Sequence, residues 1–538
     1  MRNAMKKTAL LLSVATMLVS LAGCGGKKVA EQAKASQVAA PTTVAKSVQA
    51  PEESAYKEGG KLVIAAAVGA NTFFMPTSST TGNNFMAAAA IEQLGRVEAN
   101  GEVIPWLAER FETDAEKLTF TIKLRPEVKF HDGSACDADA VAWNIEQYIA
   151  NGHASEIGSP KEVRVVDPLT VEIQYDKWAN NWANVIGALF ISSKEAYEKN
   201  GKEWCAINAV GTGPFKLTEF IADNKAVYVK NENYRIKGLP HLDELEIDVV
   251  SDMNTRVSAL MNKEVNVAIK FENAKIIEMV KKAGFESIGR QNANVADIKH
   301  IIWNSKSTKH PMGDLKVRQA IMHSIDWDNV AKSLTGGLGV ATPLFCTKDS
   351  WAMSPDAQFY TFDPELGKKM LAEAGYPNGF DTTIYCTSAN NDTATAFQAC
   401  LSLVGVRAKV EVLDKSKLAK MQVADDIDGF IANRGASQMD YTANYIRLYS
   451  SEGIKNHGIM LRPAEFEEPL FAARAAKTLD EKKHNLQKAA KALVQDYVML
   501  TPMGVVYYQS FAQPDVVNTG IYDASLEQWT PEAVAFKK

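Results

Sequence analysis

Hydrophobic residues recur with two different periods along the chain. Every second residue from Leu118 to Leu124 is apolar, the residues between them are polar, and residues 171–175 repeat this pattern. Alternation of this kind is typical of a half-buried strand. From about residue 300 to 500, strand-like segments alternate with helical ones, which favours layered α/β domains over a bundle or a β-sandwich.

Local capping signals mark the beginnings of two helices. Asp137 precedes a helical stretch over 138–148, where its carboxylate can accept hydrogen bonds from free backbone N–H groups. Asp363 and Pro364 begin a second helix, whose apolar stripe continues until Gly375 ends it. An N-cap acid followed by proline at the first helical position is a typical start signal.

The first residues follow the order of an export signal. Three basic residues among the first seven precede a mostly apolar run over 8–21, which is shorter than the roughly 20 residues of a membrane-spanning helix. The Leu-Ala-Gly-Cys sequence ending at Cys24 resembles the bacterial lipobox. This implies that residues 1–23 are a lipoprotein signal peptide. We expect an exported protein, held by lipid on Cys24 at the outer face of the cytoplasmic membrane or in the periplasm.

Residues 24–60 are expected to form the lipid anchor and a flexible tether. From 25 to 60 the sequence contains no Leu, Ile, Phe or Trp, so this stretch has little apolar surface to bury. A tether of this composition would hold the folded part near the membrane and leave it free to turn.

Charge and cysteine content narrow the possible partners and cross-links. The formal net charge of -5 argues against nucleic acid as a partner, because phosphate binding needs a basic surface. The cysteines after Cys24 are widely spaced and form no C-x-x-C pair, so they indicate neither a disulfide framework nor a zinc knuckle. We expect them to be buried small apolar residues, with a single disulfide between Cys386 and Cys400 left open. They are Cys136, Cys205, Cys346, Cys386 and Cys400.

The sequence carries no recognisable catalytic motif. Its eight histidines form no H-E-x-x-H, residues 211–216 (GTGPFK) lack the remainder of a P-loop, and no G-x-S-x-G is present. Together with the export signal, this favours a binding protein that is not an enzyme. A secreted enzyme and a receptor that only signals remain the alternatives from other classes.

Several segments, read in order, resemble the peptide/nickel/opine class (family 5) of ABC-transporter solute-binding proteins. They extend from Gly101 to Gly379, and together they are specific where each alone would be weak. Phe111, where the class usually has tryptophan, and Ala140, where it often has aspartate, are the visible departures. The segments are 101–111 (GEVIPWLAERF), 128–133, 211–216, 231–234 (NENY), Trp303 with Asn304, 314–326 (DLKVRQAIMHSID) and 363–379.

The resemblance implies a periplasmic-binding-protein-like α/β fold with two lobes joined by a hinge and an extra domain inserted in the first lobe. It places the first lobe in residues 61–91, 211–297 and 510–538, the inserted domain in 92–210, and the second lobe in 298–509. Hinge closure on the ligand would create a shape that an importer recognises. The implied partners are the membrane permease and ATPase subunits of an ABC importer, with the binding protein itself a monomer and without a cofactor.

Within this class, the sequence looks most similar to nickel-binding members. Residues 432–434 followed by Asp440, and Ser450-Ser451 seven residues before His457, carry this similarity. It implies that His457 contacts the metal of a nickel chelate carried as cargo, and imidazole suits Ni(II). The other interpretation is a solvated histidine in a polar loop. The carboxylate-holding arginine of the nickel-binding members has no counterpart, since no arginine occurs between Arg164 and Arg235.

Arg434 is the strongest candidate for a direct ligand contact. Peptide-binding members commonly present a carboxylate in this segment, whereas an arginine offers a bidentate donor fork suited to a carboxylate. We therefore expect a nickel chelate or another small carboxylate-bearing solute as the ligand, with an oligopeptide as the alternative. If Arg434 does not contact ligand, the other interpretation is that it forms a surface salt bridge.

The resemblance also suggests further ligand-contacting positions. Phe74 and Asn84 fall where the early loop of the first lobe usually meets ligand. Four more residues fall at cleft or hinge positions: Trp303, Asn304, Trp351 and Tyr441. Aromatic walls with a few polar anchors are typical of such sites, although a place in the core explains each aromatic residue equally well.

Overall fold

The computed structural model describes residues 56–78, 81–97, 102–154, 156–288, 296–348, 350–423, 427–436, 440–453, 456, 458–521 and 529–538. The expected signal peptide, Cys24 and His457 lie outside the described residues. Among the described helices, none is both long enough and apolar enough to span a membrane.

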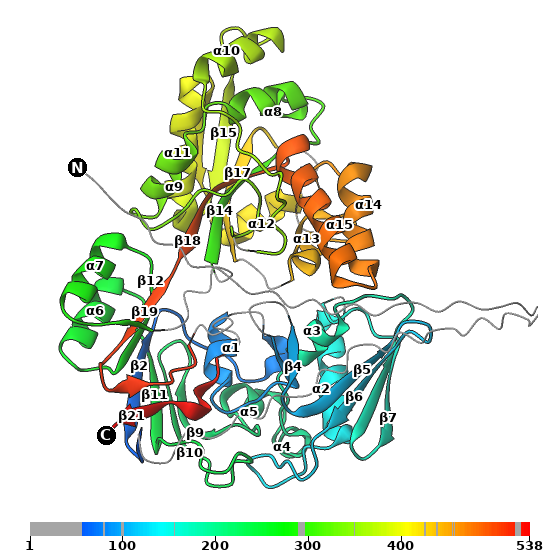
Figure 1. Ribbon diagram of the computed structural model, residues 1–538, viewed down its shortest axis with the longest axis vertical. Coiled ribbons are helices and arrows are strands. Elements are labelled where there is room, and N and C mark those ends of the chain that lie inside the picture. The colour runs from blue at the N-terminus through cyan, green and yellow to red at the C-terminus, as the bar shows by residue number, and fades with distance from the viewer. Residues whose placement is uncertain are drawn as a thin grey trace, which may run out of the picture. The chain divides into compact units, whose positions relative to one another are not determined.

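The first lobe is built on a seven-stranded sheet whose strands come from distant parts of the sequence (Figure 1). β2 at its centre pairs in parallel with β11 and β12, and the remaining pairs are antiparallel. In spatial order the strands are β13 (Ser287–Ile288), β19 (Gln509–Ala512), β12 (Val267–Phe271), β2 (Lys61–Ala66), β11 (Glu244–Val249), β10 (Lys225–Lys230) and β9 (Phe215–Ile221).

Helices α6 (Met253–Met261) and α7 (Ala274–Lys282) cover one face of this sheet. Leu260 of α6 and Val280 of α7 are fully buried in a common apolar cluster with Phe271 and Phe511 of the strands. The opposite face shares a larger core with the inserted domain. The first lobe and the inserted domain are therefore packed together.

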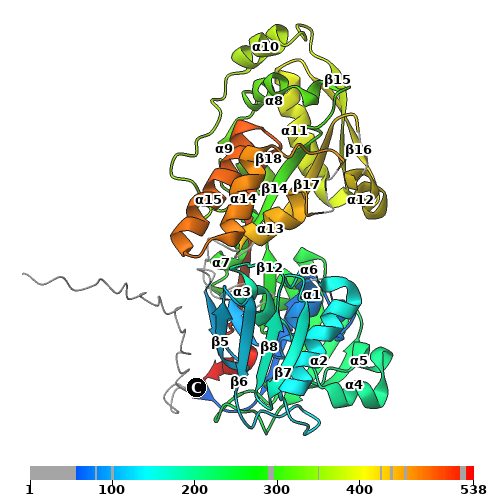
Figure 2. The same ribbon diagram turned by 90° about the vertical axis from the view of Figure 1, so that its right-hand side faces the viewer.

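The inserted domain contains a four-stranded antiparallel sheet with α2 against it (Figure 2). Its strands are β5 (Ala108–Asp114), β6 (Thr119–Leu124), β8 (Thr170–Gln174) and β7 (Glu162–Asp167), and its helices are α2 (Ala138–Tyr148), α3 (Trp182–Gly187), α4 (Lys194–Asn200) and α5 (Lys202–Ile207). The strand and helix predicted from the alternation near Leu124 and from Asp137 are confirmed. The Asp137 carboxylate accepts a hydrogen bond from the N–H of Ala140 at 3.0 Å.

The second lobe is built on a five-stranded sheet in the order β16 (Arg407–Val412), β15 (Asp381–Cys386), β17 (Phe430–Ala436), β14 (Ala296–Trp303) and β18 (Leu500–Tyr507). Helices cover both faces: α8–α11 pack in one apolar core and α13–α15 in the other, and Figure 1 shows α9 and α11 on the side opposite α14 and α15. Because β14 is covered on both faces, its alternate residues enter two different cores.

The helices of the second lobe begin where local signals place them. α10 begins at Pro364 behind the N-cap Asp363, as predicted, and the left-handed Gly375 follows its last turn. The covering helices are α8 (Leu315–Met322), α9 (Trp327–Leu334), α10 (Pro364–Glu373), α11 (Asn391–Leu403), α12 (Lys415–Val423), α13 (Tyr441–Tyr449), α14 (Ala464–Ala475) and α15 (Leu479–Lys491).

The chain passes from one lobe to the other twice. It leaves the first sheet after β13 and enters the second with β14, and it returns between β18 and β19. Tyr508 lies directly between β18 and β19. Residues near these two crossings can thus be reached from both lobes.

The remaining described elements are short. α1 (Thr81–Ala87), β3 (Gly95–Val97) and β4 (Val103–Pro105) precede the inserted sheet, while β1 (Tyr56–Lys57), β21 (Ala535–Lys537) and β20 (Val516–Val517) form a three-stranded sheet. All five cysteines after Cys24 are buried and free. Cys386 and Cys400 therefore form no disulfide, and the prediction of buried small residues is confirmed.

Candidate functional site

Charged residues from both lobes meet beside the two crossings. We call Lys270, Glu272, Asp297, Arg434 and Tyr508 the crossover cluster. Lys270 and Glu272 belong to the end of β12 and the turn after it, Asp297 and Arg434 to the second-lobe sheet, and Tyr508 to the returning crossing. The cluster brings together two cations, two carboxylates and a phenol from four separate stretches of sequence.

Arg434 is held by carboxylates from both lobes. Its Nε lies 2.6 Å from Asp297 Oδ2 and its Nη2 lies 2.7 Å from Glu272 Oε2. The antiparallel register pairs Lys299 with Arg434, so Asp297 is the diagonal neighbour on the same face of the sheet. Burial alone would lower the pKa of Arg434, but the charges of Asp297 and Glu272 raise it. The guanidinium therefore stays charged and joins the two lobes.

Lys270 occupies an unusual backbone position in the same cluster. Its φ is +68°, a left-handed conformation rare for a residue with a side chain, and it lies where the pairing of β12 with β19 shifts register. Its Nζ lies 4.7 Å from the centroid of the Tyr508 ring. Burial lowers the pKa of Lys270. The charge of Asp297 raises it and that of Arg434 lowers it again, so the pKa is lowered overall.

Tyr508 connects the cations and carboxylates. Its hydroxyl donates a hydrogen bond to Asp297, and the guanidinium carbon of Arg434 lies 5.4 Å from its ring centroid. Two cations therefore approach one ring, which cation–π attraction favours and their mutual repulsion opposes.

Among the residues predicted to contact ligand, Arg434 lies in the crossover cluster. Trp303 and Asn304 lie instead in the interior of the second lobe, each with 0% of its surface exposed. The indole of Trp303 packs edge-on against Phe397 and Phe430 and donates to Thr501 Oγ1 at 2.8 Å. The Asn304 amide donates to the carbonyl of Ile427. In this structure both residues support the core.

Tyr441 and Trp351 both pack in one apolar cluster of the second lobe. Tyr441 is 1% exposed, and its hydroxyl accepts the N–H of Thr347 at 3.2 Å. The Lys482 ammonium lies 5.7 Å from the centroid of the Trp351 ring and 2.8 Å from Asp440. These contacts tie α13 to α15.

Phe74 and Asn84 lie in the first lobe. Phe74 is 1% exposed and stacks on Tyr197, with ring centroids 5.2 Å apart. Asn84 lies on α1, is half-buried, and its Oδ1 accepts from Ser78 Oγ at 3.3 Å. The structure thus distributes the predicted positions over both lobes and brings Arg434 to the crossing.

Sequence reasoning missed four members of the crossover cluster: Lys270, Glu272, Asp297 and Tyr508. One signal was available, because Lys270 is the single charged residue within the apolar strand β12 (VAIKF). Nothing local distinguishes the other three, which acquire their role from long-range pairing.

A second bridge joins the inserted domain to the second lobe. Asn180, just before α3, donates from its backbone N–H to the Arg474 carbonyl at 3.1 Å. Its side-chain amide donates to the carbonyls of Ala473 and Ala476, each at 2.9 Å. The last carbonyls of a helix lack partners within that helix, so Asn180 caps α14 from another domain.

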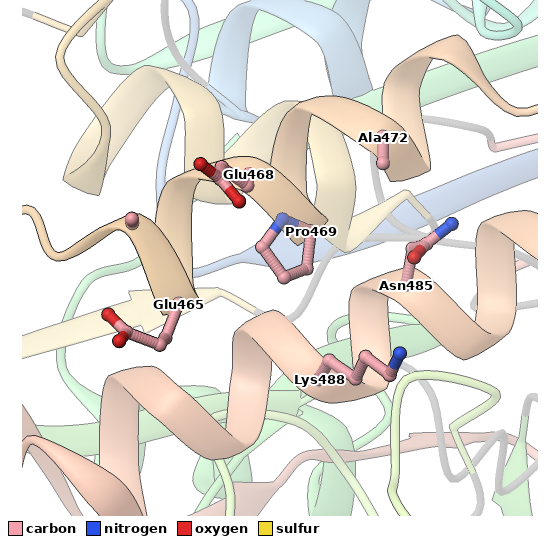
Figure 3. A pocket seen from close by; sticks show the side chains of 7 residues that line it. Glu465, Glu468, Pro469, Ala472, Asn485 and Lys488 are labelled. Atoms are coloured by element: carbon pink, nitrogen blue, oxygen red, sulfur yellow. The ribbon is translucent and has the colours of Figure 1, made fainter.

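The outer helices α14 and α15 also border a shallow groove (Figure 3). Glu465 and Glu468 lie on one side and Asn485 and Lys488 on the other, with Pro469 between them. The groove belongs to one lobe alone. No His/Cys/Asp/Glu group that could hold a metal ion is found among the described residues.

Comparison with known proteins gives the class. The model of bacterial extracellular solute-binding proteins, family 5, matches residues 102–456. The chain therefore belongs to family 5 of the bacterial extracellular solute-binding proteins, and the predicted family and α/β fold are confirmed.

Similar curated proteins carry peptide-type names. The glutathione-binding protein GsiB of Pectobacterium atrosepticum is 32% identical over 339 residues, which cover 59% of this chain and 62% of that protein. The dipeptide-binding protein of Escherichia coli is 27% identical over 497 residues, covering 84% of this chain and 89% of that protein.

Solved structures share the fold with more varied ligands. The Helicobacter pylori protein DppA in complex with the peptide STSA has a TM-score of 0.75 at 22% identity and covers 90% of this chain and 99% of its own. NikZ of Campylobacter jejuni in complex with Ni(L-His) has a TM-score of 0.72 at 19% identity, with coverage of 88% and 99%. At these identities the likeness concerns the fold.

Proposed function

We propose that the protein captures a small solute outside the cytoplasmic membrane and delivers it to an ABC importer through permease and ATPase subunits. Its family membership supports this, as does a two-lobed fold in which Arg434 of one lobe forms an ion pair with Glu272 of the other. In this proposal Cys24 carries the lipid that keeps the protein at the membrane.

For the ligand we now propose a short peptide, ahead of a nickel chelate. The observation that carries this is the mixed charge of the crossover cluster, with Lys270 and Glu272 from one lobe and Arg434 and Asp297 from the other. A peptide with free ends carries one positive and one negative group, so a site with both signs complements it. The names of the curated relatives point the same way.

This ligand differs from our first interpretation because of what surrounds Arg434. From sequence, a lone arginine favoured a carboxylate-bearing or chelated ligand. In the structure two carboxylates already neutralise it, and the side chain of Glu272 remains 44% exposed. An exposed carboxylate beside the crossing suits the ammonium of a peptide.

A thermal-shift screen of residues 25–538 tests the proposal. The panel contains glutathione, short peptides, Ni(II) with L-histidine, Ni(II) alone and small dicarboxylates. A ligand at 100 times its Kd adds about 2.7 kcal/mol to the stability of the native state, which is a visible rise in Tm. We expect that rise with peptides.

Three other outcomes would contradict parts of this proposal. A rise with Ni(II) and L-histidine that His457→Ala abolishes would replace the peptide by a nickel chelate. Turnover of a bound ligand would instead indicate an enzyme. Uptake of the ligand in cells that lack the gene separates importer delivery from signalling, since delivery requires that uptake be lost.

A further inference from the structure

The backbone of Lys270 is anchored, since its N–H donates to Ser510 Oγ at 3.1 Å and its carbonyl accepts from Arg256 Nη2 at 3.3 Å, but no ion pair within the described residues accounts for its side chain. Its neighbours in β12, Val267, Ala268, Ile269 and Phe271, are buried and apolar. Its backbone is left-handed, a conformation that strains a residue with a side chain but not a glycine.

The ammonium of Lys270 also lacks a countercharge in direct contact. Within the described part of the chain, Arg434 forms ion pairs with both nearby carboxylates. The Lys270 ammonium lies over the Tyr508 ring and is influenced by the charges of Asp297 and Glu272, but it forms an ion pair with neither. Lys270 is half-buried, and removing a charge from water is unfavourable unless it is paired. A strained backbone that delivers an unpaired cation to the crossing is better explained by a ligand than by folding.

We propose that the Lys270 ammonium receives the carboxylate of the ligand, an inference that rests on the proposed function. The ligand class is a solute with a free carboxylate, in the first instance the C-terminus of a short peptide. Arg434 then acts as a positioning residue, because it forms ion pairs with both Glu272 and Asp297. Tyr508 forms the apolar wall beside the bound carboxylate.

In this proposal the carboxylate of the ligand lies at Lys270, on the β12 side of the crossing. Lys270 therefore determines specificity for the acid end of the ligand, and its removal has little effect on ligands without an acid.

The test compares tetraalanine, its C-terminal amide and succinate as probes, by calorimetric titration of residues 25–538. Wild-type protein is expected to bind the free acid about 10- to 100-fold more tightly than the amide, the range for hydrogen bonds to a charged group. In Lys270→Met this preference is lost, so that the acid and the amide bind with about equal affinity. Lys275→Met, at an exposed position on the neighbouring helix α7, keeps it.

Lys270→Gly provides the second variant, because glycine accepts the left-handed backbone. The unliganded glycine variant is expected to melt at or above the wild-type temperature and still to lose the acid preference. A lysine with only a structural role predicts the reverse: a lower Tm and an unchanged preference. That result would overturn the inference.

Failure of the peptide proposal is distinguishable from failure of the Lys270 inference. If wild-type protein ignores both peptides but binds succinate, the peptide proposal fails, and loss of succinate binding in Lys270→Met still supports the carboxylate site. If Lys270→Met retains the preference of the wild type for any acid probe, or if the wild type binds no acid probe, the inference is wrong.

Discussion

Glu92 shows how a single buried charge connects the first lobe to the inserted domain. Its carboxylate accepts hydrogen bonds from Trp106 at 2.6 Å, Tyr234 at 2.8 Å and Thr212 at 2.8 Å, and Arg235 lies 3.3 Å away. Burial raises the pKa of Glu92, but Arg235, Thr212 and other partners outweigh it and lower the pKa below its ordinary value. The carboxylate is therefore ionised and fully engaged.

Glu92→Ala is expected to destabilise the protein by about 3 to 5 kcal/mol, because it leaves Arg235 buried without its countercharge. Urea denaturation measures the change. Glu198→Ala, at an exposed position on α4, should change the stability by no more than about 0.5 kcal/mol. Equal effects of the two substitutions would contradict this account of the buried network.

His300 makes a pH-dependent contribution to stability. It is 1% exposed in the middle of β14, its Nδ1 donates to the Ile298 carbonyl at 2.9 Å, and burial lowers its pKa to about 4. An unfolded histidine titrates near pH 6.5, so between these values the unfolded state binds more protons. The stability that His300 contributes is complete above about pH 6.5 and is lost as the pH falls toward 4.

The expected loss over that interval is on the order of 3 kcal/mol for this one group. Urea denaturation at pH 7, 5.5 and 4.5 measures it, and His300→Gln should flatten the profile. His484→Gln, on α15, serves as the matched control and should leave the slope unchanged. A wild-type slope in His300→Gln would show that other groups cause the pH dependence.

At the scale of whole elements, Asn180 links two domains through the end of α14. Asn180→Ala removes two hydrogen bonds to the Ala473 and Ala476 carbonyls and keeps the backbone one. At about 1 kcal/mol for each hydrogen bond, ligand affinity measured by titration should fall about 5- to 30-fold. Asn208→Ala is the control, since its amide also bonds a helix-end carbonyl, that of Trp204, but within the inserted domain. Equal losses would mean that the bridge does not contribute to closure.

The sequence predicted elements better than it predicted their meeting points. Asp137 and Asp363 could be assigned because a helix cap depends on a few neighbouring residues. The pairing of β2 with β11 joins segments about 180 residues apart, and no local pattern specifies it. Trp303 illustrates the same limit: the periodicity of a strand covered on both faces does not distinguish a core position from a cleft position.

At the scale of the whole molecule, the Arg434–Glu272 ion pair is one direct link between the lobes. Glu272→Gln should shift the unliganded protein toward more open conformations, seen as a larger radius of gyration in small-angle scattering. The side chain of Glu272 is 44% exposed, so water screens the pair and its contribution is about 0.5 to 1 kcal/mol. Glu264→Gln, at an exposed position before β12, should leave the radius unchanged. An unchanged radius in Glu272→Gln would mean that other contacts hold the lobes.

The two crossings also make the second lobe a segment that could be exchanged as a unit between proteins of this fold. Ala296 at its start pairs with Tyr507 at its end, so the excised segment 296–507 would begin and finish at adjacent points. On the side left behind, Ile288 pairs with Ser510, and a short linker would rejoin the remaining chain. Exchange of this segment between relatives therefore requires only two neighbouring splice points. A single exchange would then combine the first lobe of one protein with the second lobe of another.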